Sequence, residues 1–382
     1  MKINNQFNKL ILTFQSKILN IAMVCQIFSF VFILIMLGSC FLNEKATIKQ
    51  NNFTLKELHF SQLNNWQQDN HLQALQAFLH SCHKMAKLEQ NKPINGSILN
   101  ITPADYYDVC QIAQVISTLG NRQAKNFFEN WFRVFKIEGK QEKKLFTGYY
   151  EATLFGSYKK DDRYKYPVYK LPNDSWFDFS TTREQIDAGA LANKKLELLY
   201  VDDPVELFFT HIQGSATVIL PNQQKIKLVY TGRNQQKFVA IGNYLLKNGI
   251  LSAENISPIA IKEWLKQHPE KQQEVFNLNP SYIFFALSDA KQTIGAFTTP
   301  LTAERSLAVD SELVAYGSLL WVEIEQENFY KLMNSQDTGS DIKGLGRGDI
   351  FFGSGVDAEE KASNMYSNGE YYLLIPSNIF YK

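Results

Sequence analysis

Two aspartates in the C-terminal part of the chain lie in its densest run of glycines, and this run could support acid catalysis. Asp337 precedes Gly339, while Asp349 follows Gly348 and opens the apolar run 350–353. Glycine lets the backbone turn sharply or approach a ligand closely. A carboxyl group with one apolar side is partly desolvated, which raises its pKa and lets it act as a general acid near neutral pH. The alternative is that both aspartates only cap turns, as aspartates in glycine-rich loops commonly do.

Other catalytic motifs do not fit this stretch or the rest of the chain. Asp337-Thr338-Gly339 is typical of aspartic proteases, but those enzymes need two facing aspartates and the chain has one such tripeptide. Arg347-Gly348-Asp349 matches a cell-adhesion tripeptide that occurs by chance. A phosphate-binding loop would need Lys-Ser or Lys-Thr after its last glycine, and neither occurs. The sequence also lacks a G-x-S-x-G elbow and an H-E-x-x-H helix, which disfavours serine hydrolases and zinc proteases.

The first forty residues predict export and a lipid anchor. Lys2, Lys9 and Lys17 precede a long apolar run over 18–37, and residues 1–39 include no acidic residue, which is typical of a secretory signal. The run ends in Leu37-Gly38-Ser39-Cys40, which is typical of a bacterial lipoprotein cleavage site. We therefore expect residues 1–39 to be removed and Cys40 to carry the lipid, with Phe41 favouring the periplasmic face of the outer membrane. The alternative is an uncleaved signal anchor.

Cys82 and Cys110 are the cysteines left after Cys25 is removed with the signal and Cys40 is lipidated. In an oxidising periplasm they are a candidate disulfide. The alternative is a metal site, because His80 and His83 lie beside Cys82. No second Cys or His cluster joins them, so we predict no metal.

Composition limits the classes of partner. The chain has 382 residues, 45% hydrophobic and 20% charged, and a formal charge of +1. This is typical of one large or two medium folded domains, and it shows no basic excess for nucleic acid. An aromatic content of 13% favours β structure and offers stacking surfaces for a ligand such as a sugar.

Apolar spacing divides the mature chain into a helical part and a β-rich part. The residues over 41–65 are mostly polar and predict a tether. Helical periodicity follows over 66–88, 104–119 and 124–134. From Leu145 the pattern changes to short β-branched and aromatic segments between turns, at 164–169, 196–200, 216–220, 226–230, 283–287, 319–323 and 371–375. Helical segments interrupt these strands at 204–209, 243–248 and 258–267. Strands and long helices do not alternate regularly, so a doubly wound nucleotide fold is disfavoured.

Seven segments, in order, resemble the membrane-bound lytic murein transglycosylase A family with its C-terminal three-aspartate domain. The resemblance covers about residues 66–378. The matching segments are 146–151 (FTGYYE), 163–169 (RYKYPVY), 212–215 (IQGS), 230–234 (YTGRN), 279–285 (NPSYIFF), 300–310 (PLTAERSLAVD) and 337–353 (DTGSDIKGLGRGDIFFG).

The resemblance implies a mostly β protein in two domains with a groove between them. A double-psi β-barrel domain with N-terminal helices would comprise 66–151 and 286–382. A second, smaller β domain would be inserted at 152–285. Residues 1–39 would be the signal and 40–65 the tether.

The same resemblance implies the site residues. Asp349 would be the catalytic acid and base, supported by Asp310 and Asp337 through orientation and hydrogen bonding. The glycan would be held by Thr147, Gly148, Tyr149, Gln213 and Gly214. The sequence departs from the family at Ser340, Asp341 and Gln235, and the extra carboxylate of Asp341 bears on the pKa of the site.

The implied activity is that of a peptidoglycan lytic exotransglycosylase, a lyase that needs no cofactor. It would cleave the β-1,4 bond between N-acetylmuramic acid and N-acetylglucosamine and leave 1,6-anhydromuramoyl ends. Partners would be glycan strands, the membrane through Cys40 and other cell-wall enzymes, and whether cleavage is exolytic or endolytic stays open. The alternatives are a hydrolase (muramidase) that uses two aspartates and a non-catalytic cell-wall-binding lipoprotein.

Overall fold

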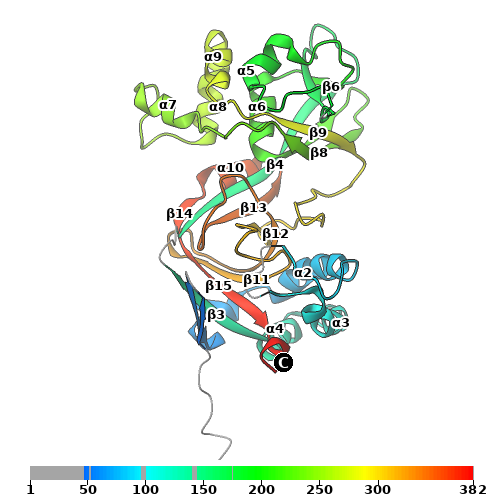
Figure 1. Ribbon diagram of the computed structural model, residues 1–382. Helices are drawn as coiled ribbons and strands as arrows, with labels where there is room; N and C mark the ends of the chain where they lie inside the picture. Colours follow the sequence, from blue (N-terminus) through cyan, green and yellow to red (C-terminus); the bar gives the residue numbers. More distant parts are fainter. Residues whose placement is uncertain (1–46, 51–52, 96–99, 140–143, 174, 382) are drawn as a thin grey trace, which may run out of the picture. The chain divides into compact units, whose positions relative to one another are not determined.

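A strand of 13 residues, β4 (Leu145–Ser157), connects the two halves of the computed structural model (Figure 1). Its first residues pair in parallel with β13 (Gly348–Ser354) and its later residues with β7 (Ser215–Ile219). The structure describes all residues except 1–46, 51–52, 96–99, 140–143, 174 and 382, and Ile48–Lys382 forms one compact unit. The predicted signal peptide 1–39 and lipidated Cys40 lie outside the described residues.

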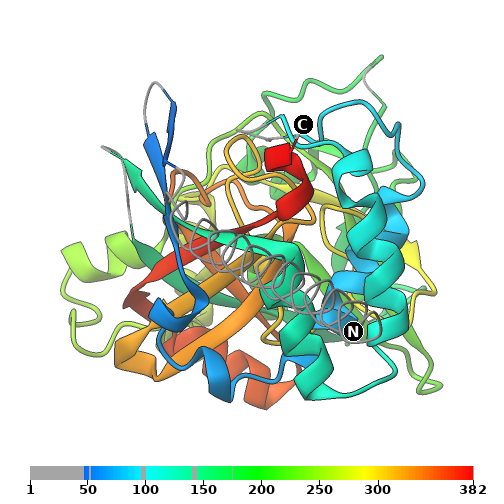
Figure 2. The same ribbon diagram turned by 90° about the horizontal axis from the view of Figure 1, so that it is seen from below.

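Before β4, the chain forms the helical part that the sequence predicts, flanked by strands. These elements are β1 (Thr47–Gln50), β2 (Phe53–Leu58), η1 (Phe60–Gln62), η2 (Trp66–Gln68), α2 (His71–Met85), η3 (Pro103–Tyr106), α3 (Tyr107–Ile116), α4 (Asn121–Trp131) and β3 (Phe132–Gly139). The three helices pack side by side (Figure 2) around one aromatic core that includes Trp66, Phe78 and Phe128. Their apolar spacing explains this packing, because each helix has one apolar face to bury.

Two predictions fail in this part. The predicted tether is wrong over 53–58, where β2 pairs with β3 and buries Leu55 completely. The third predicted helix, 124–134, is displaced by three residues, because α4 already begins at Asn121 and the chain turns into β3 at Phe132. Both strands depend on long-range partners, since β3 pairs with β15 (Glu370–Pro376), and a local pattern does not reveal such partners.

The remaining elements alternate strands with short helices. They are β5 (Tyr166–Tyr169), α5 (Arg183–Gln185), η4 (Ile186–Ala190), β6 (Glu197–Val201), α6 (Pro204–Gln213), β7, β8 (Lys225–Arg233), α7 (Gly242–Lys247), α8 (Pro258–Gln267), η5 (Pro269–Lys271), α9 (Gln272–Asn277), β9 (Ile283–Ser288), β10 (Ser306–Ala308), β11 (Leu319–Ile324), η6 (Glu325–Glu327), β12 (Phe329–Asp337), β13, α10 (Val356–Asn364), β14 (Tyr366–Asn368), β15 and η7 (Ser377–Tyr381). The fold is thus mixed α/β, and the prediction of a mostly β chain is confirmed only in part. Of these α-helices, α5, α9 and α10 were not predicted, because their sequences are short and mostly polar.

One path of strand pairing runs through the described part of the chain. Its order is β1-β2-β3-β15-β11-β12-β10-β13-β4-β7-β8-β9, with β5, β6 and β14 paired beside it. The three-residue strand β10 is therefore central, with β12 on one side and β13 on the other. No helix among the described residues is long and apolar enough to cross a membrane.

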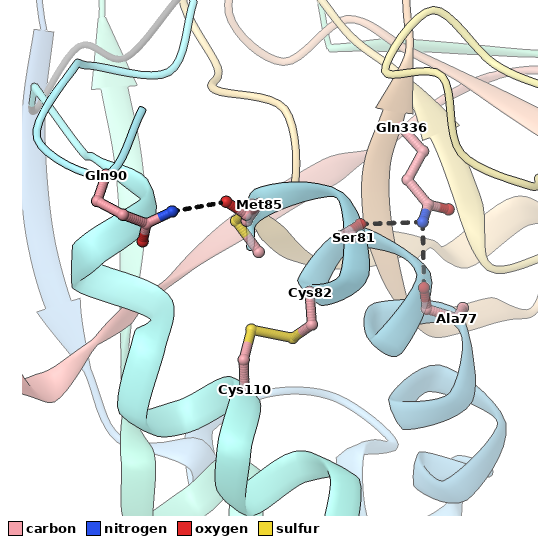
Figure 3. Close-up of a disulfide and its surroundings, with 7 residues drawn as sticks. All are labelled: Ala77, Ser81, Cys82, Met85, Gln90, Cys110 and Gln336. Carbon is pink, nitrogen blue, oxygen red and sulfur yellow. Dashed lines mark hydrogen bonds between the residues drawn. A yellow bond between two sulfur atoms is a disulfide. The ribbon is translucent and has the colours of Figure 1, made fainter. Parts of the chain in front are cut away.

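Helix α2 is fixed on two sides. The predicted cysteine pair is present as a disulfide, which joins Cys82 on α2 to Cys110 on α3 across 28 positions of sequence (Figure 3). A loop of this length stabilises a fold by about 3 to 4 kcal/mol in the chain-entropy model. The disulfide also uses the Cys82 thiol that the alternative metal site would need.

On the other side of α2, Nε2 of Gln336 donates to Ala77 O and Ser81 Oγ over 3.1 and 2.9 Å (Figure 3). Gln336 directly precedes Asp337, so this contact anchors the strand end that carries the aspartate.

Candidate active site

The three predicted aspartates meet around the end of β10. Ala308, the last residue of β10, pairs with Asp337 on β12 and with Asp349 on β13. Neighbouring strands lie about 4.8 Å apart, so the Cα atoms of Asp337 and Asp349 are separated by roughly 10 Å. Asp310 follows Ala308 by two positions. The strand pairing thus gathers at one place three carboxylates that are distant in sequence.

Asp349 is held by the strand beside it. In the parallel pairing of β13 with β4, Asp349 lies opposite Thr147, whose Oγ1 donates to Oδ1 of Asp349 over 2.6 Å. No hydrogen bond among the described residues involves its second oxygen, Oδ2, and the residue is half-buried. Oδ2 is therefore available to a ligand.

The surroundings of Asp349 favour its protonated form. Burial, helped by the charges of Asp337 and Asp341, raises the pKa of its carboxyl group to about 6, although the Thr147 hydrogen bond and the charge of Arg347 act in the opposite direction. With that pKa, roughly a tenth of the molecules carry the proton at pH 7. This is the property that the glycine-rich sequence predicted for a general acid.

Asp337 has a different environment, because both of its carboxylate oxygens accept hydrogen bonds from the protein. Its Oδ1 accepts from the backbone N–H groups of Ala296 and Thr338, both over 2.9 Å, and its Oδ2 accepts from the Tyr149 hydroxyl over 2.8 Å. Burial raises the pKa of Asp337, while these three donors act in the opposite direction. Burial and, after it, the charge of Asp337 raise the pKa of the Tyr149 hydroxyl far above its ordinary value, so Tyr149 stays a donor.

Asp310 fixes the glycine-rich loop. Its carboxylate accepts from Gly344 N over 2.8 Å and from Glu312 N over 3.1 Å, and Lys343 Nζ lies 3.3 Å away. Among the described residues, no hydrogen bond joins Asp310 or Asp337 to Asp349. Asp310 therefore positions the backbone that leads into β13, and contact with Asp349 is indirect.

The predicted glycan-binding residues lie along β4 and at the end of α6. Thr147 donates a hydrogen bond to Asp349, and Tyr149 donates one to Asp337. Gly148 has no room for a side chain, because a Cβ would lie 2.7 Å from Cα of Ala362 on α10. Gln213 Oε1 accepts from Tyr150 N over 3.2 Å, and Gly214 ends α6 with φ +86°. Four of the five residues therefore lie on β4 or bond to it directly. The fifth, Gly214, is the residue after Gln213 in the chain.

Sequence reasoning missed Arg347. The residue is 5% exposed, and its Nη2 donates to Thr147 Oγ1 over 2.9 Å. The residue stood in the tripeptide 347–349 that was set aside as chance. The signal in the sequence that could have identified Arg347 was its position two residues before Asp349.

A separate cavity of about 760 Å³ opens beside the later part of β4. Its lining includes Glu151, Phe155, Glu206 and Val356. As far as the described residues show, none of the three aspartates lines it, so this cavity does not mark the carboxylate site.

Two family models match the chain. The MltA-specific insert domain matches residues 145–286, and the 3D domain matches residues 305–375. Among curated proteins, the membrane-bound lytic murein transglycosylase A of Vibrio cholerae is 30% identical over 246 residues, which is 62% of this chain. The match spans just under two thirds of that relative, 66% of its length.

Solved structures resemble the whole described fold. A membrane-bound lytic murein transglycosylase from Agrobacterium tumefaciens has a TM-score of 0.75 at 30% identity, covering 84% of this chain and 97% of that one. The Escherichia coli MltA structure with bound chitohexaose has a TM-score of 0.65 at 23% identity, covering 87% and 94%. The second likeness concerns the fold alone.

Proposed function

Because the chain belongs to the MltA family of membrane-bound lytic murein transglycosylases, we propose that it cleaves peptidoglycan glycan strands and leaves 1,6-anhydromuramoyl ends. The bond broken is the β-1,4 link between N-acetylmuramic acid and N-acetylglucosamine. The observation that carries the proposal is one half-buried carboxyl group, Asp349, with a raised pKa and a free oxygen.

In the first step Asp349 acts as a general acid. The proton on its carboxyl group passes to the glycosidic oxygen as the bond from that oxygen to C1 of the muramoyl ring breaks. The ring then carries positive charge, and the N-acetylglucosamine hydroxyl leaves. Asp349 is now a carboxylate near the cationic ring.

In the second step the same carboxylate acts as a base. It takes the proton of the muramoyl C6 hydroxyl while that oxygen forms a bond to C1. The 1,6-anhydro ring closes and Asp349 regains its proton, so no water is consumed. Binding must hold the sugar tightly enough for its own hydroxyl to outcompete water, which requires the high effective concentration of an oriented intramolecular nucleophile.

Neighbouring residues support the two steps. We propose that Asp337 stays ionised, since it already accepts three hydrogen bonds, and that its negative charge helps stabilise the cationic ring. The remaining proposed glycan contacts, Gly148, Gln213 and Gly214, would line a groove between a double-psi barrel and the inserted domain.

We also propose that Cys40 carries a lipid that holds the protein at the periplasmic face of the outer membrane. Relatives named membrane-bound support this proposal. The anchor would bring the enzyme to murein without any basic surface, because the acyl chains supply the membrane affinity.

The reaction class is tested by mass spectrometry of purified murein digested with the protein. We expect muramoyl products with 1,6-anhydro ends. A hydrolase that used Asp337 or Asp310 as its base would instead give reducing ends that are heavier by one water. A non-catalytic binding protein would release no soluble fragment, and either of these results would overturn the proposal.

The raised pKa of Asp349 predicts that the rate falls on the alkaline side of the pH profile. The acid must carry its proton, so kcat/KM should be steady below about pH 5 and should fall about tenfold per pH unit well above its pKa of about 6. The measurement is the initial rate of soluble murein release in buffers of constant ionic strength. A rate that instead rises between about pH 6 and 8 would show that the group acts first as a base.

A further inference from the structure

The buried guanidinium of Arg347 lies where β4 and β13 meet. Nη1 donates to Leu145 O and Gly348 O over 3.3 and 2.5 Å, and Nη2 donates to Thr147 Oγ1 over 2.9 Å. Among the described residues, no ion pair within 4.0 Å involves this arginine. A buried cation without an ion-pair partner is costly to keep. The position of Arg347 beside Asp349 gives a functional reason for keeping this buried cation.

The two hydrogen bonds of Thr147 Oγ1 fix the direction in which its hydroxyl donates. A guanidinium can only donate, so Arg347 occupies a lone pair of Oγ1. The single hydroxyl proton of Thr147 is directed to Oδ1 of Asp349 over 2.6 Å. Donation by Arg347 also polarises the hydroxyl and strengthens that second bond. With Oδ1 accepting from Thr147, the acidic proton of Asp349 is left to Oδ2, the oxygen without a protein partner.

We propose that Arg347 is a positioning residue, which locks the Thr147 hydroxyl onto Oδ1 of Asp349 so that Oδ2 delivers and recovers the proton. The inference rests on the function proposed above and adds to it the choice of oxygen. It also gives Thr147 an orienting role beyond contact with glycan.

The charge of Arg347 matters in addition to its geometry. The charged or titratable groups that face Asp349 are Asp337 from β12, Asp341 from the glycine-rich loop, Tyr149 from β4 and Arg347 itself. The two acidic residues raise the pKa of Asp349, and Arg347 lowers it. Loss of Arg347 should therefore free the hydroxyl to rotate and also raise the pKa of the acid.

A double-mutant cycle at Arg347 and Thr147 tests the proposal, with kcat for murein release as the readout. Thr147→Val and Arg347→Met should each lower kcat roughly 10- to 100-fold with little change in KM, as expected for lost orientation. The double variant should be no slower than the slower single variant, because Arg347 acts through Thr147. Thr147→Ser keeps the hydroxyl and should stay within about threefold of the unchanged protein.

Arg347→Lys separates geometry from charge. Lysine keeps the cation but lacks the forked donors, so it should restore the pKa of Asp349 without restoring kcat. The pKa is followed by ¹³C NMR of labelled aspartate without any murein, where Arg347→Met should raise it by roughly 1 unit. Urea unfolding of each variant shows whether it is folded.

Three results would overturn the proposal: multiplied losses in the double variant, an unchanged kcat in Arg347→Met, or full rescue of kcat by lysine. If Arg347→Met fails to fold, the Thr147→Ser and Thr147→Val pair with Arg347→Lys still decides the matter. Failure of the proposed function would appear differently, as the absence of anhydro products from the unchanged protein, and the NMR titration would still report on Arg347.

Discussion

Replacement of Asp349 by asparagine should abolish murein cleavage while leaving murein binding largely intact. The amide keeps the shape of the side chain and can still accept from Thr147, but it can neither deliver nor recover a proton. General acid and base catalysis is worth roughly 10² to 10⁴-fold, and here one group supplies both steps, so kcat should fall at least about 10³-fold. The measurements are release of soluble fragments and cosedimentation with insoluble murein.

A matched control separates this effect from a general loss of negative charge. Asp357 on α10 is exposed and outside the site, so Asp357→Asn removes the same charge and should keep full activity. If Asp349→Asn remained fully active, the assignment of the acid would be wrong. If it lost binding as well as turnover, Asp349 would act in holding the glycan.

Replacement of Arg305 by methionine should cost about 3 to 5 kcal/mol of unfolding free energy. Arg305 Nη1 and Nη2 donate to the two carboxylate oxygens of Asp69 over 2.8 and 2.7 Å, and both side chains are almost fully buried. The same carboxylate accepts from Leu332 N on β12 over 3.0 Å. Removing the guanidinium leaves a buried carboxylate without its counterion, which urea unfolding at pH 7 should reveal.

Two further variants check the cause. The double variant Asp69→Leu with Arg305→Met removes both charges, so it should lose clearly less than the sum of the single losses. Arg163→Met breaks an ion pair with Asp202 in which the arginine side chain is 62% exposed, and the urea midpoint of this variant should barely move. A loss below about 1 kcal/mol for Arg305→Met would show that the buried pair contributes little.

Much of the local structure could be predicted because it depends on local pattern. The helices near 71–85 and 258–267 lie where apolar spacing placed them. The strands β6, β9 and β11 lie close to their predicted ranges for the same reason. By contrast, β2 and β3 were missed, because each is stabilised by pairing with a distant segment.

The sequence by itself determined which residues are present to do chemistry: a carboxylic acid in a glycine-rich run, a pair of cysteines and the motifs that carry the family resemblance. Tertiary structure alone decided how they act. The pairing of β10 with β12 and β13 brings Asp337 and Asp349 together. The register of β4 against β13 sets the Thr147 hydroxyl on Asp349. A hydrogen bond and a desolvated carboxyl group both depend on which distant strands lie side by side, and that arrangement has no local signature in the chain.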